Sequence, residues 1–97
     1  MFGKDCDFMM YGYMTLDDGT EIVHSDMKDD GTVKVYIEKP VHMGFHTATC
    51  YLPTYEWENI EGFTNSEVAD LEQLIKDNAH LIIEFSKEGG FANASSF

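Results

Sequence analysis

The chain has 97 residues, and a hydrophobic fraction of 43% supplies enough apolar material for one modest core, which argues against a disordered chain. Eighteen Asp and Glu against six Lys and Arg give a net charge of −12, which argues against direct binding to nucleic acid or to an anionic membrane surface. We therefore expect a single domain over residues 1–97.

The first half of the chain has the pattern of short strands joined by tight turns. Alternation of apolar and polar residues predicts four strands, at about 8–16, 20–27, 32–39 and 46–52. Two Asp-Asp-Gly segments are typical of hairpin turns and separate the first three strands. Pro40 and Pro53 are expected to end the third and fourth strands, because proline has no N–H for the sheet. Residues 41–45 then form a loop, and residues 54–61 form a short helix or turn.

The second half contains one long helix. Thr64-Asn65-Ser66-Glu67 is a capping box, in which the Thr hydroxyl and the Glu carboxylate each satisfy a free N–H at a helix start. Apolar residues then recur at helical spacing and predict a helix at about 65–87. Gly89-Gly90 is a natural stop for this helix, and residues 89–97 form a tail.

These elements predict an α+β fold, in which a four-stranded antiparallel meander sheet carries one long C-terminal helix on one face. A single helix covers only one face of such a sheet. The alternation places Tyr13, Tyr36 and Tyr51 on the uncovered face, where they are either solvated or part of an interface.

Acidic residues are concentrated on one side of the predicted helix. At about 100° per residue, four carboxylates fall within a sector of roughly 40°: Asp70, Asp77, Glu84 and Glu88. Those seven residues apart are separated by ~10.5 Å along the helix axis. This arrangement is either a solvated helix face or a negative strip that occupies the nucleic-acid channel of a basic protein.

Four aromatic residues gather around Pro53: Tyr51, Tyr55, Trp57 and Phe63. Interleaved with glutamates, they have the composition of a protein-binding hot spot, and the alternative is that they close one end of the core. We take Tyr55, Trp57 and Glu58 as candidate partner-binding residues beside the helix carboxylates.

The sequence has no motif that indicates catalysis or a metal site. The serines lack the Gly-x-Ser-x-Gly context, and no phosphate-cradling glycine loop is present. His42 and His46 flank Gly44 in the expected loop without an accompanying metal motif. We expect no catalytic residue, no metal and no cofactor, and keep a metal-dependent enzyme built on His42 and His46 as an alternative.

The N-terminal residues lack the pattern of a signal peptide, and the apolar runs are far shorter than the ~20 residues that span a membrane. Cys6 and Cys50 lie far apart in the sequence. We expect a cytoplasmic protein with two reduced cysteines, and one disulfide between them is the alternative.

In its length, its charge of −12, its α+β pattern and its row of helix carboxylates, the chain resembles small acidic proteins encoded by phages and plasmids, such as anti-CRISPR and other DNA-mimic inhibitors. Those inhibitors have many unrelated folds, so the resemblance transfers no residue roles. It implies a non-catalytic protein of a mobile element that blocks a nucleic-acid-binding effector.

Two binding hypotheses follow from these patterns. The first is an inhibitor or regulator that binds a basic protein, such as a nucleic-acid-binding effector, by charge mimicry. The second is a structural module in which the aromatic patch or the open sheet face forms a homodimer.

Overall fold

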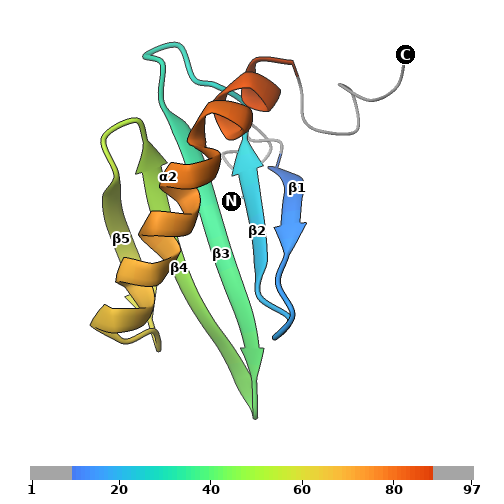
Figure 1. Cartoon of the computed structure of the whole chain (residues 1–97), viewed down its shortest axis with the longest axis vertical. Helices are drawn as coiled ribbons and strands as arrows, with labels where there is room; N and C mark the ends of the chain where they lie inside the picture. The colour runs from blue at the N-terminus through green and yellow to red at the C-terminus, as the bar shows by residue number, and fades with distance from the viewer. Residues whose placement is uncertain (1–9, 89–97) are drawn as a thin grey trace, which may run out of the picture.

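The structure, a computed structural model, describes residues 10–88 of the chain, with side chains described through Lys87. Five strands and one helix follow one another along these residues: β1 (Met10–Thr15), β2 (Glu21–Ser25), β3 (Val33–Val41), β4 (Gly44–Leu52), β5 (Glu56–Glu61) and α2 (Asn65–Glu88). The strands form one antiparallel meander in the order β1-β2-β3-β4-β5, and α2 lies across one face (Figure 1). The predicted α+β fold with a C-terminal helix is confirmed, with five strands in place of four.

The additional strand, β5, occupies part of the segment that we expected to be a short helix or turn. It pairs with β4 at one edge of the sheet, with Trp57 opposite Cys50 and Glu58 opposite Thr49. Glutamate has a low β propensity, so the alternation of Trp57 with glutamates gave little indication of a strand. Pairing with β4 and packing of Trp57 against the core override that weak local preference.

The expectation that Pro40 ends the third strand, followed by a loop over 41–45, is wrong. Pro40 lies inside β3 opposite Phe45, and the β3–β4 ladder continues to Val41 opposite Gly44. The pairing of β2 with β3 ends at Glu21 and Glu38, so β3 has a free edge on that side beyond Glu38. A proline is tolerated at such a free edge, because no neighbouring strand needs its N–H.

The two predicted Asp-Gly turns are present and share one geometry. Asp18 Oδ1 accepts hydrogen bonds from the backbone N and Oγ1 of Thr20 at 3.0 and 2.6 Å. Asp30 Oδ1 accepts the same pair from Thr32 at 3.0 and 2.7 Å. Each aspartate is therefore held by the threonine two residues later, which explains its place in the turn.

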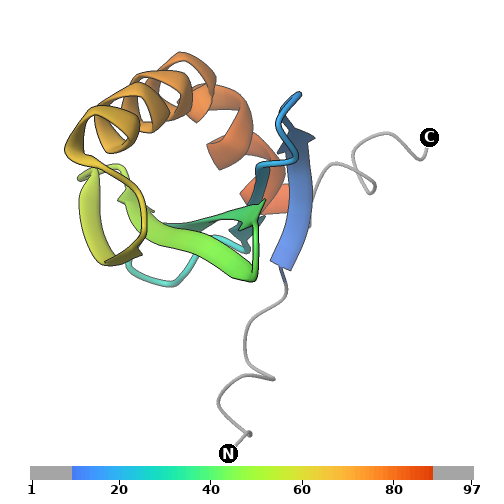
Figure 2. The same cartoon turned by 90° about the horizontal axis from the view of Figure 1, so that it is seen from below.

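The core lies between α2 and the concave face of the sheet, which curves around the helix (Figure 2). Its buried apolar side chains come from the three central strands and from the helix: Ile22, Val33, Val35, Ile37, Ala48, Cys50, Leu52, Leu71, Ile75 and Ile82. The alternation of β3 and the helical spacing of α2 predict most of these buried residues, although Leu81, which the spacing also places on the apolar stripe, is 38% exposed.

Tyr13 lies on the helix side of the sheet, and its expected place on the uncovered face is wrong. Its hydroxyl donates to Asn78 Oδ1 at 2.8 Å, and its ring centre lies 6.1 Å from that of Phe85. The β1–β2 register shifts between Gly12 and Met14, so Tyr13 and Met14 both pack against the core. A β-bulge of this kind interrupts the alternation on which the prediction depended.

The capping box is formed as predicted. Thr64 N donates to Glu67 Oε1 at 2.8 Å, and Glu67 N donates to Thr64 Oγ1 at 3.1 Å. The helix begins at Asn65 and ends at Glu88, one residue beyond the predicted range. Within residues 10–88 no helix is long and apolar enough to cross a membrane. The Gly89-Gly90 stop, the 89–97 tail and Cys6 lie outside the described residues.

Candidate interaction surface

Three of the predicted binding carboxylates form an exposed line on α2, which we call the helix row: Asp70, Asp77 and Glu84. Gln73 Nε2 donates to Asp77 Oδ1 at 3.0 Å. The nearby Lys76 is directed elsewhere, since its Nζ lies 3.2 Å from Glu72 and 5.3 Å from the centre of the Tyr55 ring. Glu88 is the last residue of α2, and its side chain lies outside the described residues.

Three of the four predicted aromatic residues, Tyr55, Trp57 and Phe63, pack against the core of the molecule. Trp57 Nε1 donates to Glu72 Oε1 at 2.8 Å, and both Trp57 and Tyr55 are half-buried against the core cluster. Glu58 lies on the opposite, convex face of the sheet, where it accepts a hydrogen bond from the Tyr51 hydroxyl at 2.8 Å. The structure therefore separates the predicted binding residues onto two faces.

A second line of carboxylates, which the sequence did not predict as a group, crosses the convex face of the sheet. The strand register places Glu21 of β2 opposite Glu38 of β3, Glu38 opposite Thr47 of β4, and Thr47 opposite Glu61 of β5. We call Glu21, Glu38 and Glu61 the sheet row. Directly opposed side chains have Cβ atoms about 5 Å apart, so Glu21 and Glu38 are close like charges.

The pKa of Tyr36 is affected by the negative charge of the convex face. Burial raises the pKa of Tyr36, and the negative charges of Glu38 and Glu61 raise it further. Burial likewise raises the pKa of Tyr51, as does its hydrogen bond to the Glu58 carboxylate. Both tyrosines therefore remain neutral on a negatively charged surface, where the Tyr51 hydroxyl donates to Glu58.

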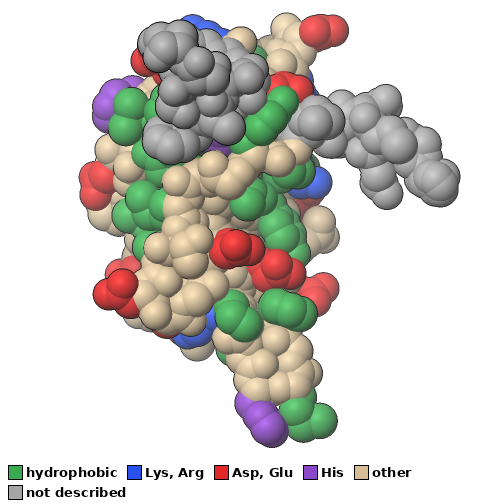
Figure 3. All heavy atoms as spheres, turned by 90° about the vertical axis from the view of Figure 1, so that its right-hand side faces the viewer, with side chains coloured by type: hydrophobic (Ala, Val, Ile, Leu, Met, Phe, Trp, Pro, Cys, Tyr) green, Lys and Arg blue, Asp and Glu red, His purple; other side chains and the backbone are tan. Residues whose placement is uncertain are grey.

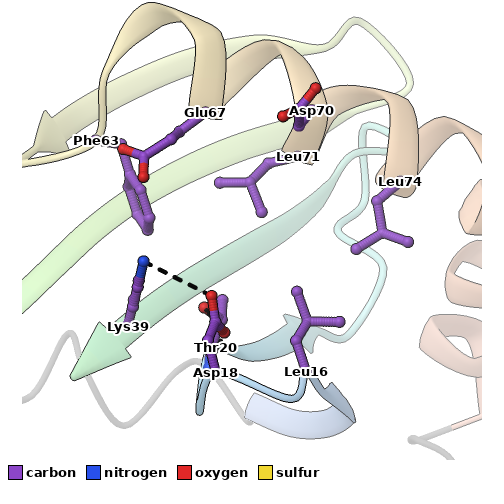
Figure 4. A pocket seen from close by; sticks show the side chains of 9 residues that line it. All are labelled: Leu16, Asp18, Thr20, Lys39, Phe63, Glu67, Asp70, Leu71 and Leu74. Atoms are coloured by element: carbon purple, nitrogen blue, oxygen red, sulfur yellow. Dashed lines mark hydrogen bonds and ion pairs between the residues drawn. The ribbon is translucent and has the colours of Figure 1, made fainter. Parts of the chain in front are cut away.

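A cleft lies between the start of α2 and the β1–β2 turn, with a volume of about 340 Å³ (Figure 4). Its apolar lining comes from Leu16, Phe63, Leu71 and Leu74. Asp70 of the helix row stands at this cleft together with Glu67 and Asp18. The one lysine among the lining residues, Lys39, has its Nζ 3.6 Å from Asp18 Oδ2. The cleft thus joins the helix row to the carboxylates of the turn.

The histidines do not converge on a site. His42 is exposed in the β3–β4 turn, whereas His46 is half-buried on β4 with its ring centre 5.6 Å from that of Phe63. His24 is fully buried and its Nδ1 is bonded to the Ser25 carbonyl at 2.9 Å. Among the described residues, no three His, Cys, Asp or Glu side chains gather in a way that could hold a metal ion.

Cys50 is a free, buried thiol. Burial raises its pKa to about 12, and the charge of Glu72 adds to that increase. The thiolate is the reactive form of cysteine, so this residue is poorly suited to act as a nucleophile.

Seen from the side of β1, acidic side chains are spread over the visible face of the molecule (Figure 3). No protein-family model, no curated protein and no solved structure matches the chain. The function must therefore be inferred from the surface itself.

Proposed function

We propose that the protein is a non-catalytic inhibitor or regulator that binds a basic protein partner and occupies that partner's nucleic-acid-binding surface. The observation that carries the proposal is the sheet row, in which Glu21 stands directly opposite Glu38, and Glu61 lies on the same line across the sheet. Like charges directly opposite one another destabilise a sheet, so the fold itself gives no reason for this arrangement. A partner rich in Lys and Arg would supply the missing opposite charge.

The helix row supports the same proposal from a second surface. Asp70, Asp77 and Glu84 are exposed and spaced by ~10.5 Å, and the neighbouring Lys76 pairs with Glu72. The helix row and the sheet row lie on opposite faces of the molecule, and each has the negative charge that a surface built to contact the phosphates of a nucleic acid attracts.

The test begins with affinity capture. The tagged chain is incubated with a lysate of the cells in which it occurs at about 50 mM salt, a concentration at which electrostatic contacts are only weakly screened. Bound proteins are eluted with a salt gradient and identified by mass spectrometry. The purified partner is then mixed with labelled DNA or RNA, and fluorescence anisotropy measures whether the chain displaces the nucleic acid. We expect a basic partner, displacement of its nucleic acid, and affinity that falls steeply with salt.

Two variants of equal charge change test whether the position of the charge matters. Glu38→Lys/Glu61→Lys reverses two members of the sheet row and should lower the affinity by at least about 100-fold, because close charge pairs each contribute ~1.5 kcal/mol or more to such complexes. Asp17→Lys/Asp29→Lys changes the net charge equally at two exposed turn residues outside both rows and should bind nearly as well as the native chain. Equal losses in both variants, or binding that is insensitive to salt, would contradict the proposal.

A further inference from the structure

The hairpin that joins β3 and β4 extends beyond the rest of the sheet (Figure 1). The pairing of β2 with β3 ends at Glu38, and the pairing of β5 with β4 ends at Thr47. Beyond these positions the two strands pair only with each other, up to Val41 opposite Gly44. The segment His42–Phe45, which we call the hairpin tip, therefore projects from the body of the molecule.

The hairpin tip contains two large apolar side chains that are exposed. The exposed fraction of Met43 is 90%, the highest among the exposed large hydrophobic residues, and that of Phe45 is 59%. Figure 3 shows the tip protruding at one end of the molecule, with histidine and hydrophobic side chains at its extremity. Neither Met43 nor Phe45 belongs to the core cluster or to the residues packed against it. Burial within this chain therefore does not explain the two side chains.

The backbone at Met43 also disfavours a methionine. Its φ is 67°, in the left-handed region that glycine and asparagine adopt most readily. The second central residue of a tight turn is commonly Gly or Asn for this reason. A long apolar side chain here costs conformational free energy and gains no packing, so neither the local geometry nor the core accounts for Met43.

The surroundings of the tip indicate what it would contact. Pro40 and Phe45 face each other across the hairpin. The next pair on the same face is Thr47 with Glu38, and Glu38 belongs to the sheet row. The apolar tip is thus followed directly by a line of carboxylates. This order of groups is complementary to an apolar pocket with a basic rim, whereas a second copy of this chain or an anionic membrane would repel it.

We propose that the hairpin tip is the apolar anchor of the interaction surface and that Met43 and Phe45 insert into an apolar pocket of the basic partner, next to the Lys and Arg that contact the sheet row. This inference rests on the proposed function and names the part of the chain that enters the partner. A few buried apolar side chains often carry a large share of the affinity of a protein interface, and close charge pairs beside them add affinity, association rate and specificity.

A photo-crosslinker tests the placement directly. The full chain carries p-benzoylphenylalanine at position 43 or, as a control, at position 29 in the β2–β3 turn. Each version is irradiated with the purified basic protein that the affinity capture identifies. We expect a crosslink from position 43 onto an apolar segment of that protein and none from position 29. A crosslink from position 29 alone would overturn the inference.

Three single variants then separate the tip from the charges. Met43→Gly and Phe45→Thr should each weaken binding about 10-fold or more without changing the slope of log Kd against log salt, because they remove no charge. Met43→Gly should also leave Tm equal or higher, because glycine adopts the backbone conformation of residue 43 without strain. Ile60→Thr on β5 is the control, since Ile60 is 41% exposed outside the tip, and it should bind like the native chain.

The outcomes distinguish this inference from the proposed function. If Glu38→Lys/Glu61→Lys loses binding and both tip variants bind within twofold of the native chain, the inference is overturned and the proposed function stands. If the tip variants lose binding while salt and charge reversal have no effect, the proposed function fails. Two other results would overturn the inference. One is a dimer of the chain alone, seen by sedimentation, that Met43→Gly abolishes. The other is binding to phosphatidylcholine–phosphatidylglycerol vesicles that Met43→Gly abolishes.

Discussion

The carboxylates of the two Asp-Asp-Gly-Thr turns and those of the sheet row have opposite relationships to the fold. Asp18 and Asp30 each accept two hydrogen bonds from a threonine two residues later, so their negative charge is compensated locally. Glu21 and Glu38 stand opposite each other, where each charge opposes the other. The comparison teaches that the carboxylates of this acidic chain are not alike, since folding uses those of Asp18 and Asp30 and opposes the pairing of Glu21 with Glu38. In the proposed function, it is this second group of carboxylates whose charge a basic partner would neutralise.

After reversal of the sheet row, reversal of the helix row is expected to cause the largest loss of affinity, whereas charge reversal in the turns should cause almost none. Asp77→Lys/Glu84→Lys should weaken binding to the basic partner about 10-fold or more, because two exposed carboxylates would become repulsive to its lysines and arginines. Circular dichroism should show an intact fold, since both residues are exposed on α2. The charge-matched pair Asp17→Lys/Asp29→Lys, at two exposed turn residues, should bind nearly as well as the native chain. Normal binding by Asp77→Lys/Glu84→Lys would show that the helix row is not part of the surface that binds the partner.

The turn aspartates should instead affect stability, and unequally. Asp18→Ala should lower Tm by about 4–8 °C, because Thr20 is 2% exposed and its hydroxyl would lose a buried partner. Asp30→Ala should lower Tm by less, since Thr32 is only half-buried and water can replace the aspartate. Thermal unfolding followed by circular dichroism measures both values. An equal decrease for the two variants would show that burial of the threonine does not matter.

The decrease of Tm on acidification should depend on Asp18 and Asp30 more than on the other surface carboxylates. Hydrogen bonds from Thr20 and Thr32 hold the pKa values of Asp18 and Asp30 below the ordinary value of 3.8. Their contribution to stability is thus fully present above about pH 4 and is lost as the pH falls through their folded-state pKa values. In the variant Asp18→Asn/Asp30→Asn, which keeps a side-chain acceptor and cannot titrate, Tm should fall less between pH 4 and pH 2. Some loss should remain, because the pKa of Glu67 is also lowered by the capping box.

The parts of the fold that can be predicted from the sequence are those whose hydrogen bonds join residues close together in the sequence. The capping box at Thr64 and Glu67 and the Asp-Gly turns are satisfied by neighbours in the sequence, so their spacing indicates them. The sequence alone misplaces Tyr13 because a register shift in β1 interrupts the alternation, and it does not reveal β5 because the pairing of β5 with β4 outweighs a poor strand composition. In both cases tertiary contacts decide the outcome.

The candidate surface was predictable only where it lies on one element. The helix row follows from spacing along a single helix, so the sequence was sufficient to group Asp70, Asp77 and Glu84. The sheet row joins residues of three strands, and its members become neighbours only through the register of the whole sheet. The exposure of Met43 likewise depends on how far the β3–β4 ladder extends beyond its neighbours, which Pro40 obscured in the sequence.

The smallest expected effect tests most directly whether the sheet row opposes folding. Glu38→Gln removes one of two opposed charges and should increase the free energy of unfolding by about 0.2–1 kcal/mol, measured by urea denaturation at low salt. Glu21→Gln should give a similar gain, and the double variant should gain less than the sum, because either change alone removes the repulsion. At about 0.5 M salt the gain should largely disappear, since salt screens exposed charges.

Glu56→Gln is the matched control for this measurement. Glu56 is exposed on β5 opposite Tyr51, so it has no carboxylate directly across the strand pair. Its neutralisation should leave the free energy of unfolding nearly unchanged, apart from the small general benefit of lowering a net charge of −12. A gain equal to that of Glu38→Gln would mean that total charge, and not the register of Glu21 with Glu38, opposes folding. The pairing of Glu21 with Glu38 would then not be a specific cost to folding, and the carboxylates of the turns and of the sheet row would differ only in their hydrogen bonds.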